Sequence, residues 1–278
     1  MRKLKFFLTL VITILIITGC ASGGKDKPKK DNWNDFQTAK KIVIGFDNTF
    51  VPMGFQDKSG NNVGFDIDLA NAVFEKYGIK VEWQAINWDL KETELKNGYI
   101  DLIWNGYSKT QERESVVQFT KQYMVNEQVV VVKKSKGIKN ITDLKDKVLG
   151  AQNGSSGYDT FNENPEVLKN IVKNNDATQY ESFNEALIDL ENDRIDALLI
   201  DRVYANYYLK QQNKLEDFDI FNAGFESEAF AVGARKADTT LVNKINEAFF
   251  EMYKEGKFQE ISKKWFGEDV ATEELKTK

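Results

Sequence analysis

Two stretches of the sequence, ELKNGYIDLIW at residues 94–104 and DLENDRIDALL at residues 189–199, share a pattern that decides the fold class. Each pattern predicts the end of a helix, a turn and an apolar strand. At a constant offset of 95 residues the matching pairs are Leu95 and Leu190, Asn97 and Asn192, Ile100 and Ile195, and Asp101 and Asp196. Such internal similarity predicts two lobes of similar topology, although unrelated helix-turn-strand units also converge on this pattern.

Strands and helices alternate on both sides of the repeated stretches. The runs KIVIGFD at 41–47 and IKVEWQAI at 79–86 predict strands, and apolar spacings of three and four predict a helix at 64–78. In the second half, DKVLGAQ at 146–152 predicts a strand, and the capping box SFNE at 182–185 opens a helix. Because strands separated by helices favour βαβ units, we predict an α/β fold of two lobes, each a mainly parallel sheet flanked by helices.

The order of the elements also predicts how the chain divides. The amphipathic C-terminal tail and the strand before it are expected to return to the first lobe, so that the chain crosses between the lobes near residues 125–129 and 225–229. Two crossings make a hinge with one soft axis. We therefore assign residues 41–126 plus 228–278 to lobe 1 and residues 127–227 to lobe 2.

The N-terminus predicts export from the cytoplasm. A cationic start with Arg2, Lys3 and Lys5 precedes an apolar run at 6–17, which is typical of a signal peptide, here placed at residues 1–19. The apolar run is too short to be assigned as a membrane-spanning helix.

The sequence Ile17-Thr18-Gly19-Cys20 resembles the lipobox of bacterial lipoproteins. The resemblance implies a lipid such as palmitate on Cys20, and hence an extracytoplasmic protein anchored to the outer face of the cell membrane, in an organism expected to be Gram-positive. The alternative is a free thiol behind an ordinary signal peptide. Residues 20–40 are polar and have no apolar period, which predicts a flexible tether.

The composition closes several routes to catalysis. The sequence has no histidine and Cys20 is its only cysteine, which rules out a histidine-based triad, a histidine metal site and a disulfide framework. The net charge of −5 argues against a nucleic-acid partner. We expect a monomer that is not an enzyme and holds neither a metal nor a cofactor.

Four loops follow strands that correspond between the predicted lobes. They are DNTFVP at 47–52, NGYSKT at 105–110, NGSSGY at 153–158 and DRVY at 201–204. Ligands of open α/β sheets bind outside the carboxyl ends of the strands, so we expect these loops to meet across one cleft.

The polar side chains of these loops suit the charged ends of a zwitterion. Arg113 supplies a two-pronged cation beside the hydroxyls of Ser108 and Thr110 at the start of a helix, and this combination favours a carboxylate. Ser155 and Ser156 add hydroxyl and amide donors from the other lobe.

Asp201, on the matching strand end, offers an acceptor for an ammonium, and Phe50 and Trp88 are expected to wall the cleft. Each residue has a plainer alternative. Asp201 would be a helix N-cap, Arg113 a surface ion pair, and Trp88 part of the core. The residues expected to contact the tip of the ligand are Tyr107, Gln152 and Asp47.

Five motifs, GFDIDLA, IDLIWNGYSKTQER, ITDLKDKVLGAQNGSS, RIDALLIDR and KKWFG, occur in order between about residue 40 and Gly267. Together they resemble the solute-binding proteins of polar amino acid ABC importers, the family of the lysine/arginine/ornithine, histidine and glutamine binding proteins. The resemblance implies a two-lobed clamshell of the type II periplasmic-binding-protein kind, which delivers a polar L-amino acid to an ABC permease and its ATPase.

The resemblance also implies roles at the site. It assigns the ligand carboxylate to Arg113, helped by Ser108 and by Ser156 with its amide. It assigns the ligand ammonium to Asp201 and the carbonyl of Gly106, while the two aromatic walls bracket the ligand side chain.

The sequence departs from the family pattern where the ligand side chain would lie. Tyr107 stands where many members carry a smaller residue, and VPMGF at 51–55 replaces a frequent aromatic and acidic version. Asp47, with Glu92 and Glu94, favours a cationic ligand, but Asp47 is equally compatible with a glutamine-like one, and the two glutamates suit a solvated helix face. Cystine is a further candidate.

Two other functions use the same scaffold. Cyclohexadienyl dehydratases resemble these binding proteins, and Glu181 and Glu226 are the acids that would serve such an enzyme. A sensor ectodomain would need a membrane span near the C-terminus, which GEDVATEELKTK at 267–278 does not supply. Partnership with a separate membrane sensor stays open as an alternative.

Overall fold

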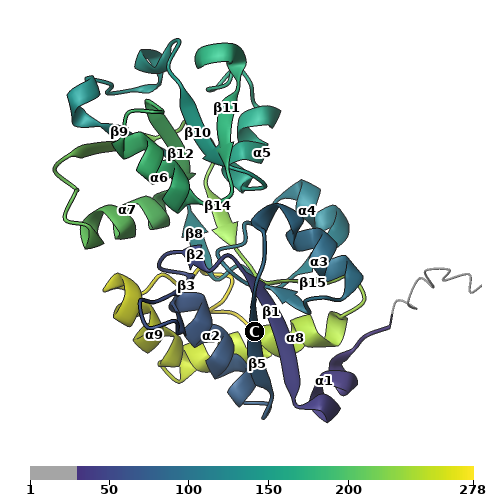
Figure 1. The fold of residues 1–278 in the computed structure, drawn as a ribbon. Helices are drawn as coiled ribbons and strands as arrows, with labels where there is room; N and C mark the ends of the chain where they lie inside the picture. The colour runs from purple at the N-terminus through teal and green to yellow at the C-terminus, as the bar shows by residue number, and fades with distance from the viewer. Residues whose placement is uncertain (1–29) are drawn as a thin grey trace, which may run out of the picture.

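The computed structural model describes residues 30–278, which form two lobes, each built around a five-stranded sheet (Figure 1). The predicted signal peptide and Cys20 lie outside the described residues. The predicted α/β class is confirmed.

The first sheet has the strand order β5-β1-β6-β15-β7. β1 pairs in parallel with β5 and β6, whereas β15 pairs antiparallel with β6 and β7. Its strands are β1 (Lys41–Phe46), β5 (Lys80–Ala85), β6 (Leu102–Ile103), β7 (Val117–Phe119) and β15 (Gly233–Arg235). Its helices are α1 (Trp33–Ala39), α2 (Phe65–Glu75), η1 (Trp88–Leu90), α3 (Lys91–Asn97), α4 (Gln111–Val116), α8 (Thr239–Lys254) and α9 (Lys257–Phe266).

The second sheet has the equivalent order β11-β10-β12-β9-β13. β10 pairs in parallel with β11 and β12, and β9 pairs antiparallel with β12 and β13, so both sheets are mixed. Its strands are β9 (Gln128–Lys133), β10 (Leu149–Gln152), β11 (Ala177–Tyr180), β12 (Ala197–Asp201) and β13 (Phe218–Asn222). Its helices are η2 (Lys134–Lys136), η3 (Ile141–Leu144), α5 (Ser156–Glu163), η4 (Lys173–Asn175), α6 (Phe183–Glu191) and α7 (Arg202–Gln211).

The repeated stretches occupy equivalent places, as α3 with β6 and as α6 with β12. Asp101 Oδ2 accepts a hydrogen bond of 3.0 Å from the backbone N–H of Val43, and Asp196 Oδ2 accepts one of 3.0 Å from that of Val148. Each aspartate thus ties the start of its own strand to the neighbouring strand. The sequence similarity therefore reflects one packing arrangement used in both lobes.

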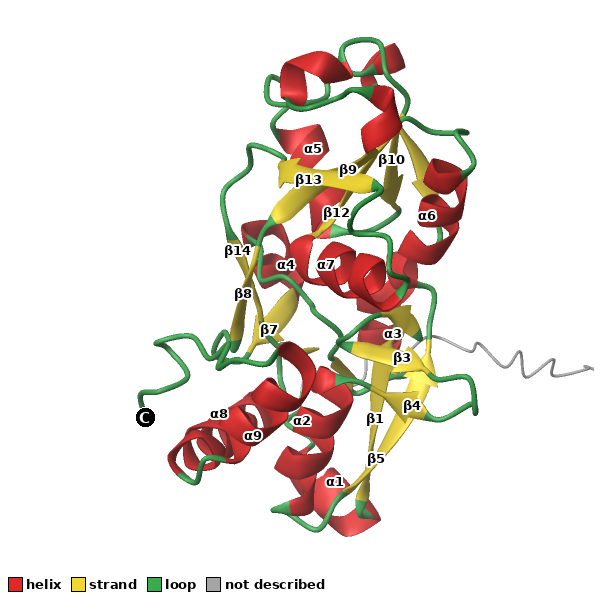
Figure 2. Cartoon of the chain, turned by 90° about the vertical axis from the view of Figure 1, so that its left-hand side faces the viewer, coloured by secondary structure: helices red, strands yellow, loops and turns green. Residues whose placement is uncertain are grey.

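Two short strands lie between the sheets. β8 (Met124–Asn126) pairs antiparallel with β14 (Glu228–Phe230), and the chain passes from one lobe to the other at this ladder (Figures 1 and 2). A separate small sheet of β2 (Thr49–Phe50), β3 (Gly54–Gln56) and β4 (Asn62–Val63) lies near α2.

Two local predictions need correction. The flexible tether predicted for residues 20–40 is wrong at its C-terminal end, because α1 buries Trp33 and Phe36 in the core of the first lobe. The single strand predicted just before the C-terminal tail, in EAFAVGARK at 228–236, is two strands, β14 in the hinge ladder and β15 in the first sheet. In α1, the apolar side chains of Trp33 and Phe36 lie at helical spacing, and their burial outweighs the polar composition of the segment before β1.

Candidate functional site

The carboxyl ends of corresponding strands bring the predicted residues together. Asp47 follows β1, Gln152 ends β10 and Asp201 ends β12. Of the twelve predicted ligand-binding residues all are buried except Thr110, which is half-buried. Hydrogen bonds join the two lobes here: Gln152 Nε2 donates to Asp47 Oδ2 at 2.8 Å, and the hydroxyls of Ser108 and Ser156 lie 3.0 Å apart.

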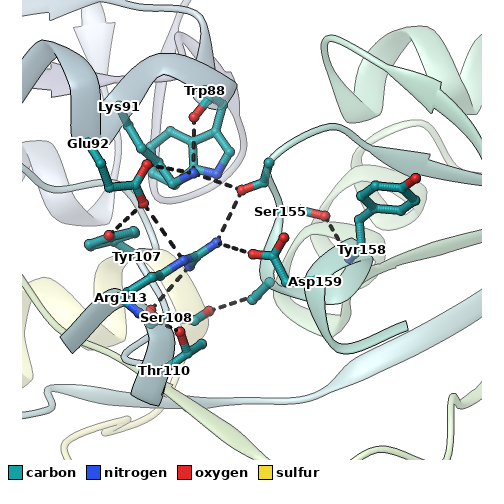
Figure 3. Close-up of polar contacts among 12 residues, drawn as sticks. Trp88, Lys91, Glu92, Tyr107, Ser108, Thr110, Arg113, Ser155, Tyr158 and Asp159 are labelled. Atoms are coloured by element: carbon teal, nitrogen blue, oxygen red, sulfur yellow. Dashed lines mark hydrogen bonds and ion pairs between the residues drawn. The ribbon is translucent and has the colours of Figure 1, made fainter. Parts of the chain in front are cut away.

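Arg113 lies at the centre of the contacts between the lobes (Figure 3). Thr110 caps α4 by accepting from the Arg113 N–H, which fixes the helix that carries the guanidinium. Arg113 Nη1 donates to the Ser108 carbonyl at 3.1 Å, and Nη2 donates to the Gly154 carbonyl and to Asp159 Oδ2, both at 3.1 Å. Arg113 is thus an interlobe cation and not the surface ion pair that was the alternative prediction.

The two serines of the second lobe have different roles. Ser155 Oγ accepts from the Tyr158 N–H at 3.1 Å and donates to the Gln152 carbonyl at 2.8 Å, so its hydroxyl caps α5. Ser156 Oγ faces Ser108 and lies 3.5 Å from Gln128 Nε2. Of the two hydroxyls, that of Ser156 is therefore the one at the interface between the lobes.

Asp201 occupies the N-cap position of α7, but its side chain caps no helix N–H. Asp201 Oδ1 instead accepts from Asn126 Nδ2 at 2.6 Å and from Gln128 Nε2 at 3.0 Å. Burial, together with the neighbouring charge of Glu228, raises the pKa of Asp201. A buried acid whose side-chain N–H donors are neutral amides, and which pairs with no lysine or arginine of residues 30–278, is suited to a cation that comes from outside the protein.

The aromatic walls behave differently from one another. Phe50 reaches the second lobe, where its ring lies 5.5 Å from that of Tyr204 and 6.0 Å from that of Phe183. Trp88 packs edge-to-face on Tyr107 at 5.9 Å within a cluster of the first lobe, which agrees with the core alternative.

Gly106 holds the turn between β6 and the site. Its φ is +57°, and a Cβ there would lie 2.7 Å from Phe50 Cε1, so only glycine fits. Its N–H donates at 2.7 Å to Asp66 Oδ2, and burial raises the pKa of Asp66 to about 7.

Two residues predicted at the ligand tip have protein partners. Asp47 Oδ1 accepts from the backbone N–H and the hydroxyl of Thr49, and burial raises the pKa of Asp47. The Tyr107 hydroxyl donates to Glu92 Oε1 at 2.8 Å. Glu92 is therefore engaged at the site, whereas the sequence favoured a solvated helix face.

Five residues of the site were not predicted from the sequence. They are Lys91, Asn126, Gln128, Asp159 and Glu228. Lys91 is the most buried lysine among the described residues, and its Nζ donates to the carbonyls of Trp88 at 3.1 Å and Gly154 at 2.8 Å. None of the five lies in a motif, and each has a partner in a distant part of the chain. Only their charge or amide chemistry could therefore have drawn attention to them.

Two α/β lobes, a short hinge ladder and buried charges that meet between the lobes define a periplasmic-binding-protein-like receptor. The family model for bacterial extracellular solute-binding proteins, family 3, matches residues 42–268, and the chain belongs to that family. Its relatives are amino-acid-binding proteins of ABC transporters, and the chain is a solute-binding protein of this class.

Three relatives illustrate the similarity. The arginine-binding extracellular protein ArtP of Bacillus subtilis is 31% identical, and the match covers 96% of this chain and 98% of ArtP. The L-cystine-binding protein TcyJ of Escherichia coli K12 is 29% identical, with 82% and 84% covered. The third is an ABC uptake transporter substrate-binding protein from Streptococcus pneumoniae, solved as a crystal structure with bound histidine. Its sequence is 67% identical, the TM-score is 0.87, and the match covers 87% of this chain and 99% of that one.

The acids nominated for an enzyme do not meet the requirement for a buried general acid. Glu181 and Glu226 are both exposed. Within residues 30–278, no helix is long and apolar enough to cross a membrane, and no group of three or more acidic or cysteine side chains is placed to hold a metal ion.

Proposed function

We propose that this chain is an extracytoplasmic lipoprotein that captures a polar L-amino acid between its lobes and delivers it to an ABC importer. One observation carries the proposal: a polar path connects a buried cation to a buried anion. Arg113 donates a hydrogen bond to the Ser108 carbonyl, and the Ser108 hydroxyl is hydrogen-bonded to that of Ser156. The Ser156 hydroxyl in turn lies beside the side-chain amide of Gln128, which donates a hydrogen bond to Asp201. The ends of this path match the carboxylate and the ammonium of an amino acid.

Closure supports capture. The first lobe supplies the cation and the second lobe the anion, so only the closed form presents both to one ligand. The ladder of β8 and β14 is the hinge in this proposal, with residues 41–126 plus 228–278 as lobe 1 and 127–227 as lobe 2.

The ligand side chain is proposed to be cationic or glutamine-like. Histidine is the first candidate, because the 67% identical structure carries histidine. Arginine is the second, supported by ArtP and by the 36% identical ancestral arginine-binding protein, which has been solved with arginine and with glutamine. Cystine stays in the panel because TcyJ binds L-cystine.

Titration calorimetry tests the proposal. L-histidine, L-arginine, L-lysine, L-glutamine and L-cystine are each titrated into the wild type and into Arg113→Ala. We expect at least one to bind and Arg113→Ala to abolish or greatly weaken that binding. Binding by none of the amino acids, or equal binding by both proteins, would refute the proposal. Incubation with prephenate and arogenate tests the dehydratase alternative in parallel.

The lipid anchor is a separate part of the proposal. It rests on the lipobox resemblance at Cys20, which lies in the segment before the described residues. We expect Cys20→Ser, which removes the thiol that would carry the lipid, to move the protein from the membrane fraction to the soluble fraction. Unchanged partitioning would contradict the anchor without affecting ligand binding.

A further inference from the structure

Asp201 shares both of its amide partners with a second carboxylate. Asn126 Nδ2 donates to Glu228 Oε1 at 2.7 Å as well as to Asp201, and Gln128 Nε2 also donates to Glu228 Oε1 at 2.7 Å. The two carboxylates therefore lie side by side, held by the same two NH2 groups. Asn126 and Glu228 face one another in the hinge ladder, so this arrangement joins the hinge to the end of β12.

No cation of the described chain neutralises this pair. Neither Asp201 nor Glu228 has an ion pair with a lysine or arginine between residues 30 and 278. The nearest cation along the chain, Arg202, instead donates its Nε to Glu127 Oε2 at 2.9 Å. Two adjacent carboxylates, one of them fully buried, cannot both be charged at low cost, and burial together with the charge of Glu228 raises the pKa of Asp201. A bound cation relieves the same repulsion while both groups stay ionised.

The other polar atoms of the cluster also lack a donor. Asn126 Oδ1 and Gln128 Oε1 have no hydrogen-bond partner, although their side chains are only 4% and 3% exposed. Such buried acceptors are costly unless a donor satisfies them. The cluster thus offers two carboxylates and two amide oxygens, and what it lacks is a group that carries several N–H donors and a positive charge.

We propose that Glu228 is a second carboxylate of the ammonium site, so that the ligand ammonium is bound jointly by Asp201 from the second lobe and Glu228 from hinge strand β14. This inference rests on the proposed function and adds a residue to it. An alkylammonium has three donors, which suits a site with more than one acceptor.

The position of β14 brings this site close to the carboxylate-binding side. Ser108 forms an isolated β-bridge with Phe230, and the Lys109 N–H donates to the Ala229 carbonyl. The strand that carries Glu228 therefore runs beside the stretch that carries Ser108. A ligand that bridges Arg113 and Asp201 would meet the hinge itself through its ammonium.

The experiment compares amino acids with analogues that lack only the ammonium. L-histidine and 3-(imidazol-4-yl)propanoate, and L-arginine and 5-guanidinopentanoate, are measured by calorimetry or, for weak binders, by competition. The proteins are the wild type, Glu228→Gln, Glu228→Asp and the control Glu226→Gln, which changes an exposed acid two residues away. Thermal melts check that each variant folds.

We expect Glu228→Gln to weaken binding of the amino acid at least 10-fold while changing binding of its desamino analogue less than twofold. Glu228→Asp should recover part of the loss, and Glu226→Gln should resemble the wild type. Equal losses for the amino acid and its analogue, or no loss for either, would overturn the role of Glu228. Failure of the wild type to bind any amino acid would instead refute the proposed function.

Discussion

Arg113 and Asp159 form an ion pair between the lobes, with 3.1 Å between Nη2 and Oδ2. The guanidinium is almost fully buried, whereas the carboxylate is partly exposed. In the same position Arg113 is proposed to bind the ligand carboxylate, so one cation would serve both closure and ligand recognition. We therefore expect closure and affinity to be coupled through Asp159.

Asp159→Asn should weaken ligand binding about 5-fold, because a partly exposed ion pair contributes about 1 kcal/mol to the closed form. The loss should shrink at high salt, since screening weakens the pair in the wild type. Calorimetry at low and high salt measures both. Asp193→Asn is the control, because Asp193 pairs with Lys133 and Lys136 within one lobe. Tighter binding by Asp159→Asn would instead mean that Asp159 competes with the ligand carboxylate.

A second prediction concerns the close approach of the lobes at Gly154. Its φ is +67°, and a Cβ there would lie 2.8 Å from the Cα of Asp89 in the other lobe. Gly154→Ala should therefore hinder closure and weaken ligand binding at least 10-fold, besides costing about 1 kcal/mol of stability for the left-handed backbone.

Gly137→Ala is a matched control for this prediction. Gly137 has nearly the same φ of +68°, but a Cβ there meets nothing within 4 Å. We expect both variants to melt at a lower temperature and only Gly154→Ala to lose affinity. Similar affinities in the two variants would contradict a role for Gly154 in closure.

A third prediction follows from Lys91. Burial lowers the pKa of Lys91 to about 8 in the folded protein, whereas an unfolded lysine has a pKa of about 10.4. Between these values the unfolded state binds more protons, so the contribution of Lys91 to stability rises with pH; below about pH 8 the burial penalty is present in full.

Lys91→Met lacks this titration. The free energy of unfolding of the wild type minus that of Lys91→Met should therefore increase by about 2 kcal/mol from pH 7 to pH 9.5. Urea unfolding at both pH values measures the difference. Lys145→Met, which changes an exposed lysine, should show no such trend. A constant difference between wild type and Lys91→Met would contradict the lowered pKa.

The two-lobed fold was predictable because the repeated residues make the same local packing contacts in each lobe. The side chain of Ile100 would clash with a Cβ on Gly45, with 2.5 Å to Cδ1, and that of Ile195 would clash with one on Gly150, with 2.6 Å. Such packing of an apolar side chain against a strand glycine requires particular residues, and the repeat in the sequence reflects that requirement. The positions of the loops at the strand ends were predictable as well, because they follow from the order of strands and helices along the chain.

The partners of the site residues were not predictable in this way. Glu228 meets Gln128 across 100 residues of sequence, and Lys91 meets Gly154 across 63. These contacts depend on how the lobes close, which no local period or motif encodes. The hydroxyl of Ser155 is a related case, because a serine at a helix start suits a cap and a ligand equally well, and in the structure it forms the cap.

The last prediction concerns which amino acid the site selects. Asp47 is a buried acid at the end of β1, where Gln152 of the other lobe donates to it at 2.8 Å. If the charge of Asp47 recognises a cationic ligand side chain, Asp47→Asn should weaken the binding of L-arginine and L-histidine about 10-fold or more, because a charge-assisted hydrogen bond becomes a neutral one. The affinity for L-glutamine should change by less than about threefold. Parallel calorimetric titrations of the three amino acids measure this change in selectivity.

Glu92→Gln is the comparison variant, since Glu92 is the other acid that meets a predicted tip residue, through the Tyr107 hydroxyl at 2.8 Å. If selectivity changes in Glu92→Gln and not in Asp47→Asn, the ligand side chain is recognised on the Tyr107 side of the cleft and not at Asp47. Equal losses for all three amino acids in Asp47→Asn would mean that Asp47 acts by holding Thr49 and Gln152 in place, and that the charge of the ligand side chain is read elsewhere.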